Sequence, residues 1–166
     1  NSRDQLLACI PRLRRYPRAL VGDRAGADDL VLDTVERGWA RLTSWEGGSD
    51  MRAWLFSIMH NLRIDQVRRP SVLTETLNEE TSMATALGSP SSGLELRDME
   101  TALRALPEEQ REILLLVALE EMSYDDVAQT LKIPIGTVMS RLSRAREKMR
   151  ANMEGRAYIA PLKVVK

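Results

Sequence analysis

The sequence predicts an all-α protein made of two small helical domains joined by a flexible linker. Hydrophobic residues form 43% of the chain but aromatic residues only 4%, a balance that favours helices packed through aliphatic side chains over a β-sandwich. Apolar residues recur every three or four positions in both halves, which is the period of an α-helix. The segment 71–93 is rich in Ser, Thr, Glu, Gly and Pro and has no Lys or Arg, which indicates a linker.

The first domain is expected to span residues 1–70 and to begin with a helix over about 3–21. Apolar side chains follow the helical period in this segment, but Pro11 and Pro17 interrupt it. Proline lacks a backbone donor and clashes with the preceding turn, so this helix is expected to kink or split.

Two more helices are expected in this domain. The first covers about 27–42, and its buried stripe is predicted to be Val31, Val35, Trp39 and Leu42. The other covers about 51–69 and starts after an N-cap residue, either Ser49 or Asp50. Pro70 ends it, because proline cannot continue a helix without losing a hydrogen bond.

The second domain is expected to span residues 94–156 and to hold four shorter helices. The first, about 94–106, stops at Pro107, which is predicted to serve as the first residue of the next helix. That next helix is apolar nearly all round as far as Leu119, so it is expected at the centre of a small bundle. The remaining segment, 157–166, is a tail without an assigned role.

The last two helices are predicted to form a helix-turn-helix over 123–150. Ser123, with an acidic residue three positions later, resembles a capping box, and the turn from Lys132 to Ile135 sets a steep crossing. One face of the final helix is apolar: Val138, Leu142, Ala145 and Met149. Its opposite face carries hydroxyls and arginines, which can meet phosphates and guanine edges in a major groove.

Several function classes are disfavoured. The net charge is formally zero, although an acidic stretch at 95–126 is followed by a basic one at 136–156. With Cys9 and His60 as the single residues of their types, neither an internal disulfide nor a Cys/His metal site can form.

Paired carboxylates, a nucleophile with its base and a glycine-rich phosphate loop are not recognisable in the sequence, so an enzyme is the least favoured class and no cofactor is expected. No apolar run approaches the ~20 residues that span a bilayer, and a cytoplasmic location without membrane insertion is expected.

Three segments of the sequence resemble conserved regions of one protein family. The segment MSYDDVAQTLKIPIGTVMSRLSRAREKM resembles region 4 of the extracytoplasmic-function (ECF) sigma factors of the bacterial sigma-70 family. The segments ADDLVLDTVERGWARL and MRAWLFSIMHNLRIDQVRR resemble region 2 of the same group, in the expected order and without a region 3 between them. The resemblance implies a promoter-specificity subunit that binds core RNA polymerase and promoter DNA, does no chemistry, and is held inactive by an anti-sigma factor wedged between its halves.

The resemblance also assigns residues to three surfaces. The polymerase-binding residues would be Asp29, Leu32, Asp33, Glu36 and Arg37. The residues at the −10 element would be Ser49, Asp50, Met51, Arg52, Asn61, Arg63, Arg68 and Arg69. His60 lies beside them in the sequence, and by itself it is better interpreted as an ordinary surface or half-buried histidine. The residues at the −35 element would be Pro134, Gly136, Thr137, Ser140, Arg141, Ser143 and Arg144. The apolar surface of the helix 108–119 that its own bundle leaves open is a candidate site for the polymerase flap.

Two positions depart from the family pattern, and alternatives stay open. Lys132 stands where the turn often has glycine, and Met139 stands where a Lys or Arg often reaches DNA. A sigma-like decoy, which sequesters an anti-sigma factor without binding DNA, is favoured by Met139 but disfavoured by Arg141 and Arg144. A free-standing regulator that uses the helix-turn-helix alone does not account for the first half of the chain.

Overall fold

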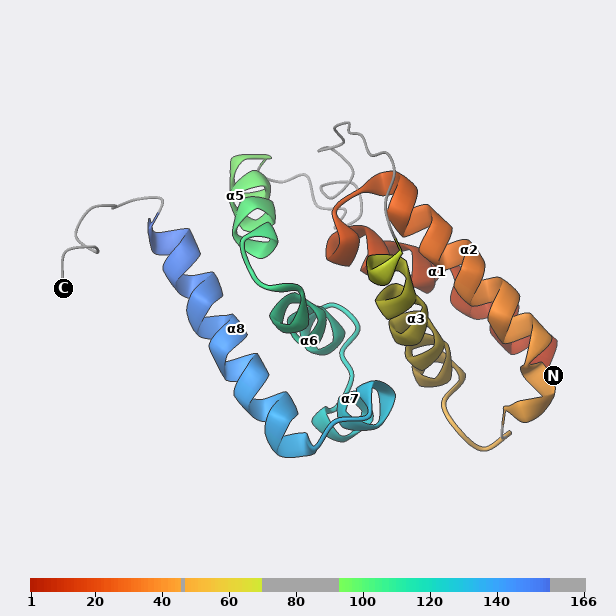
Figure 1. The fold of residues 1–166 in the computed structure, drawn as a ribbon. Helices are drawn as coiled ribbons and strands as arrows, with labels where there is room; N and C mark the ends of the chain where they lie inside the picture. Colours follow the sequence, from red (N-terminus) through yellow and green to blue (C-terminus); the bar gives the residue numbers. More distant parts are fainter. Residues whose placement is uncertain (46, 70–92, 156–166) are drawn as a thin grey trace.

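The computed structural model describes residues 1–45, 47–69 and 93–155, and every regular element in these ranges is a helix (Figure 1). The all-α prediction is therefore confirmed. The expected linker, apart from its last residue, and the expected tail lie outside the described residues.

The first half consists of α1 (Ser2–Val21), α2 (Arg24–Ala40), a short 3₁₀ turn η1 (Leu42–Ser44) and α3 (Met51–Arg68). The predicted N-cap of α3 is Asp50, whose carboxylate accepts a hydrogen bond of 3.1 Å from the Arg52 N–H. The C-terminal end of α1 is capped by Gly22, which adopts a left-handed conformation (φ 81°). This role suits glycine because it has no Cβ.

Helix α1 is a single helix through Pro11 and Pro17, so the split considered from the sequence does not occur. The predicted inner face of α2 was partly wrong: Val35 and Leu42 are half-buried against the core, but the fully buried residues are different ones. Its buried residues are Ala27, Leu30, Thr34 and Gly38.

The face that α2 buries is rotated about the helix axis from the predicted one, because small residues on it let α2 approach α1 and α3 closely. A Cβ atom built on Gly38 would lie 2.8 Å from Leu55 Cδ2 and 3.3 Å from Leu6 Cδ1. Trp39, the largest residue of the predicted stripe, is instead 45% exposed. The Arg3 guanidinium carbon lies 5.4 Å from the centroid of its ring, a cation–π distance.

The second half consists of α5 (Gly93–Arg104), α6 (Glu108–Ala118), α7 (Tyr124–Leu131) and α8 (Ile135–Gly155). Pro107 was predicted to be the first residue of this helix, but it is the N-cap of α6, and the helix itself starts one position later, at Glu108. As predicted, α6 is central: it packs against α8, α7 and α1. The last two helices begin close to their predicted starts, and Ser123 Oγ accepts a hydrogen bond of 3.0 Å from the Asp126 N–H.

The two halves do not stand apart but share one hydrophobic core. Helix α1 packs on α6, and α3 packs on α7. Buried residues of both halves form a continuous cluster that runs from Leu6 of α1 to Ala145 of α8. In Figure 1, α6 and α7 accordingly lie between α8 on one side and α1 and α3 on the other.

None of the described helices combines the length and the apolar character that a membrane-spanning helix needs.

Candidate nucleic-acid interface

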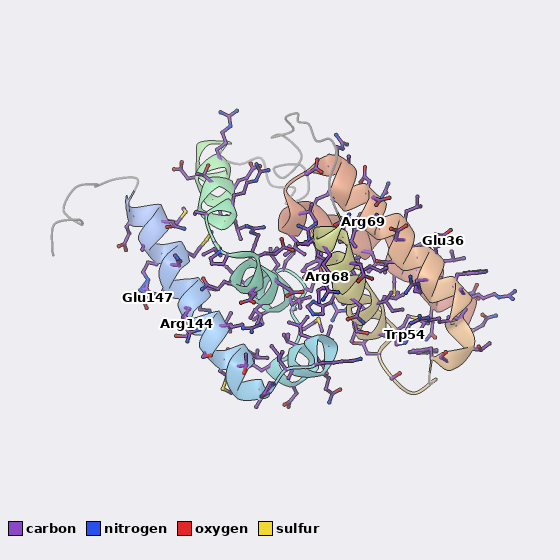
Figure 2. All side chains as sticks on the ribbon, in the orientation of Figure 1. Glu36, Trp54, Arg68, Arg69, Arg144 and Glu147 are labelled. Atoms are coloured by element: carbon purple, nitrogen blue, oxygen red, sulfur yellow. The ribbon has the colours of Figure 1, made fainter. Side chains whose placement is uncertain are left out.

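The face of α8 that was predicted to read DNA is accessible. Val138, Leu142 and Ala145 are buried against the rest of the second half, so the opposite side of the helix points to solvent. All seven residues predicted for the −35 element are exposed or half-buried: Pro134, Gly136, Thr137, Ser140, Arg141, Ser143 and Arg144. Figure 2 shows Arg144 on the outer side of α8.

The turn that sets the angle of α8 has a specific backbone conformation. Lys132 is left-handed (φ 59°, ψ 48°), and its N–H donates to the carbonyl oxygen of Ala128. This is the position at which the family pattern often has glycine, and the positive φ explains the preference, because a Cβ is disfavoured there. The N–H of Thr137 donates to the Pro134 carbonyl oxygen at 2.9 Å, which starts α8 directly after the turn.

Met139 lies on the same exposed side of α8, with 48% of its surface accessible. A thioether can neither pair with a phosphate nor donate to a guanine edge. Among the residues predicted for the −35 element, the cations are Arg144, which is exposed, and Arg141, which is half-buried. Arg146 and Arg150, both exposed, line a pocket together with Met139.

The five residues predicted to bind polymerase lie on one face of α2. Asp29, Glu36 and Arg37 are exposed, Asp33 is half-buried, and Leu32 is 66% exposed.

Electrostatics at this face of α2 are dominated by negative charge. Burial raises the pKa of the Asp33 carboxyl, and the nearby carboxylates of Asp29 and Glu36 raise it further, while Arg69 and Arg37 lower it. Asp33 and Arg69 also line one shallow pocket between α2 and α3. Arg69, which was predicted to face DNA, thus also adjoins the acidic face of α2.

The residues predicted for the −10 element divide into two groups. Five are exposed: Ser49, Asp50, Asn61, Arg68 and Arg69. The other three are not. Met51 is a core residue with 5% exposure. The side chains of Arg52 and Arg63 point toward the second half of the chain and form hydrogen bonds with it.

These contacts join α3 to α6 and to the residues just after it. Arg63 holds Glu108 with two parallel hydrogen bonds, of 2.6 Å from Nε and 2.8 Å from Nη2. His60 Nδ1 lies 2.6 Å from Glu112 Oε2. Arg52 Nη1 donates to the carbonyl oxygen of Glu120 at 2.8 Å.

The same interface contains pairs that involve α1. Arg15 donates to the Leu119 carbonyl oxygen at 3.1 Å, and Arg111 Nη1 donates to the Leu20 carbonyl oxygen at 2.5 Å. The Glu120 carboxylate is fully buried between Arg15 and Arg52. Burial raises its pKa, although the charges of Arg15, Arg12 and Arg52 lower it.

The acidic partners of these cations could not be predicted from the sequence. Glu108 lies in the first turn of α6, where acidic residues are generally favoured, and that local pattern does not point to Arg63. Helix α6, whose open apolar surface is the candidate site for the polymerase flap, also packs against α1 in this arrangement.

Comparison with known proteins identifies the two halves separately. Residues 6–60 match the model of the Sigma2 domain of PhyR, and residues 96–149 match that of Sigma-70, region 4. Over 150 residues the chain is 37% identical to the ECF RNA polymerase sigma factor EcfG of Rhodopseudomonas palustris (strain TIE-1), covering 90% of this chain and 83% of the relative. The chain belongs to the ECF sigma factors. The family predicted from the two motifs is thus confirmed.

Solved structures agree with this assignment. The ECF sigma fold described here is similar to the sigma factor RpoE in complex with the anti-sigma factor NepR from Bartonella quintana. The TM-score is 0.76 at 32% identity, covering 92% of this chain and 96% of that one. The PhyRSL–NepR complex from Sphingomonas sp. Fr1 shares the fold, with a TM-score of 0.71 at 22% identity and coverage of 95% and 92%.

Proposed function

We propose that this ECF sigma factor binds core RNA polymerase and directs it to promoters as a non-catalytic specificity subunit. The observation that carries this proposal is the pairing of two different surfaces on one chain. The exposed face of α8, with Arg141 and Arg144, has the chemistry of a major-groove reader. The acidic and apolar face of α2 at Asp29, Leu32 and Glu36 has that of a protein-binding surface. Figure 2 shows Arg144 and Glu36 at opposite ends of the molecule, so both surfaces can be engaged together.

The individual roles of the predicted residues are part of this proposal. We assign the seven residues of the turn and α8 named above to the −35 element, and the α2 face to polymerase. We assign the exposed Arg68 and Arg69 at the end of α3, together with the loop at Ser49 and Asp50, to the −10 region. Because the proposed partners, RNA polymerase and chromosomal DNA, are in the bacterial cytoplasm, we propose that the chain acts there.

An anti-sigma factor is part of the proposed function. A related sigma factor of similar fold is described in complex with the anti-sigma factor NepR. In this chain, an anti-sigma factor that covered the proposed polymerase-binding face of α2 would block polymerase directly. The decoy alternative is less well supported, because a decoy has no need for the exposed arginines of α8.

The test is to mix the purified chain with core polymerase, follow co-elution on gel filtration, and map DNA protection on promoter fragments. The proposal predicts a stable complex whose footprint covers two separate patches upstream of the start site. Failure to co-elute with polymerase would overturn it. Co-elution without promoter protection would favour a decoy.

A further inference from the structure

The first two turns of α8 carry an exposed apolar strip made of Ile135 and Met139. Ile135 is 38% exposed and Met139 is 48% exposed, and a spacing of four residues places their side chains next to each other on one side of the helix. Helix α8 joins the core through other residues, namely Val138, Leu142 and Ala145. The apolar strip is therefore open to a partner, and neither of its members is among the seven residues predicted for the −35 element.

The exposed residues beside the apolar strip offer few hydrogen-bond donors. Gly136 has no side chain, and a Cβ atom built on it would meet no atom within 4 Å. The Ser140 hydroxyl donates to the Thr137 carbonyl oxygen at 3.4 Å, so its proton is engaged within the helix. A DNA base edge that approaches the start of α8 on this side therefore meets mainly apolar surface.

A cation lies further along the same side of α8. Met139, Ser143 and Arg146 follow one another at helical spacing and line a pocket beside Tyr124 of α7. Arg146 is exposed and lies ~10 Å beyond Met139 along the helix axis, at 1.5 Å per residue. Glu147 also lines this pocket, but it lies more than two turns beyond Met139. A recognition helix contacts base edges with its N-terminal residues, whereas many arginines around it pair with phosphates. This order suits the apolar strip to base edges and Arg146 to the DNA backbone.

Thymine is the base whose major-groove edge suits such a strip. Guanine, cytosine and adenine present hydrogen-bonding groups in that groove, whereas thymine presents a C5-methyl group beside its O4 acceptor. An apolar side chain placed over the other three edges would displace water from polar atoms without replacing the lost hydrogen bonds, which costs free energy. Over a methyl group, the same side chain buries apolar surface, which is favourable. The unbranched and polarisable side chain of methionine can adjust its shape to this contact.

We propose that the apolar strip selects promoters with thymine at one base pair of the −35 element, through contact of Met139 with the C5-methyl group. Met139 is then a specificity-determining residue, and Ile135 extends the apolar surface one turn toward the start of α8. This inference rests on the proposed function and deepens it, because it names what one part of the −35 surface reads. In place of the phosphate contact that a lysine or arginine would make, this chain gains a contact that distinguishes one base.

The test removes single methyl groups from the DNA. A promoter fragment identified by sequencing run-off transcripts is bound by holoenzyme, which is the full chain with core polymerase. Each thymine of its −35 element, on either strand, is replaced in turn by deoxyuridine, which differs from thymidine by the methyl group alone. The same series is measured with Met139→Ala. Met153→Ala is the matched control, because Met153 is a methionine of the same helix that is 36% exposed and lies ~21 Å further along the axis.

For the wild type and for Met153→Ala, one such replacement should weaken binding about fourfold, a ratio equal to ~0.8 kcal/mol, which is the scale of one buried methyl-sized group. For Met139→Ala, the same replacement should have no effect, because the side chain that covers the methyl group is gone. The inference is overturned if no single replacement weakens binding of the wild type, or if Met139→Ala responds as strongly as the wild type does. Circular dichroism of each variant checks that its helices are intact.

A second variant tests the base preference itself. Fragments randomised at the base pair found by this scan are selected by holoenzyme that contains the wild type or Met139→Arg. The wild type should select thymine, whereas Met139→Arg should lose this preference, because a guanidinium binds phosphates or guanine and has no apolar surface for a methyl group. Equal selection of thymine by both would contradict the inference. Holoenzyme that fails to form or to bind the fragment is a failure of the proposed function, whereas promoter binding without a methyl effect is a failure of this inference alone.

Discussion

Lys132 is the residue whose backbone conformation sets the helix-turn-helix. Its φ of 59° is one of two positive values at non-glycine residues in the described part of the chain, the other being at Glu121. A side chain in this region costs ~1 kcal/mol relative to glycine. The chain therefore holds α8 in place with a mildly unfavourable residue at the turn.

Replacing Lys132 with glycine should stabilise the chain. Lys132→Gly is expected to raise the free energy of unfolding by up to ~1 kcal/mol, because it removes the Cβ clash. Lys148→Gly, within α8, should instead lower the free energy by ~1 kcal/mol through lost helix propensity. Urea unfolding of both variants makes the comparison, and a destabilised Lys132→Gly would show that the lysine side chain itself supports the turn.

Arg141 and Arg144 are the cations on which the proposed −35 contact depends. The double variant Arg141→Ala/Arg144→Ala should lose ~1–3 kcal/mol of promoter binding per arginine, which lowers promoter use at least tenfold, while polymerase binding is spared. Arg150→Ala, further along the same helix, is the control. Quantified run-off transcripts and polymerase co-elution separate the two effects, and unchanged promoter use would show that the recognition face is assigned wrongly.

At the level of elements, Gly38 determines how closely α2 can pack. Gly38→Val should lower the free energy of unfolding by ~1–3 kcal/mol, because the new side chain would overlap Leu55 and Leu6. A Cβ on Gly136 meets no atom within 4 Å, so Gly136→Ala should be neutral or slightly stabilising. Thermal unfolding of both variants compares the sites, and equal melting temperatures would contradict the close packing of α2.

Glu120 makes the contact between the halves sensitive to pH. Burial raises its pKa in the folded chain, so the folded chain binds this proton more tightly than the unfolded chain does. The contribution of Glu120 to the free energy of unfolding is therefore greatest below the ordinary carboxyl pKa and falls as the pH rises through the raised value, with a slope of at most ~1.4 kcal/mol per pH unit for one proton.

A neutral replacement tests this linkage. Glu120→Gln should flatten the fall in the free energy of unfolding across that pH window, because the amide has no proton to lose. Denaturant unfolding at a series of pH values measures the slope, with Glu121→Gln, an exposed neighbour, as the control. Parallel curves for Glu120→Gln and the wild type would show that Glu120 does not titrate in the window.

The elements that sequence could predict are those with local causes. Ser123 caps α7 through a bond to a residue three positions away, and the face of α8 follows a regular apolar period, so both were predicted correctly. The face of α2 was mispredicted because Thr34 and Gly38, which it buries, carry little apolar surface. The pairing of Arg63 with Glu108 joins residues 45 positions apart, and no local pattern encodes it.

At the scale of the whole molecule, the shared core changes the meaning of the two domains. The family motifs mark two halves, which we propose to act on separate DNA elements, yet the buried cluster joins them into one body. Tyr16 illustrates the joint: it is buried, and the carboxylates of Glu112, Glu108 and Glu120 from the second half contribute to the raised pKa of its phenol.

The central claim is that this chain selects promoters for RNA polymerase, and the 5′ ends of run-off transcripts test it most directly. Purified chain, core polymerase and a library of genomic promoter fragments would be incubated, and the transcripts sequenced. The account predicts transcripts that start at a limited set of sites sharing two upstream sequence elements, and that are absent when the chain is left out. Transcripts that are independent of the chain, or that share no upstream elements, would contradict it.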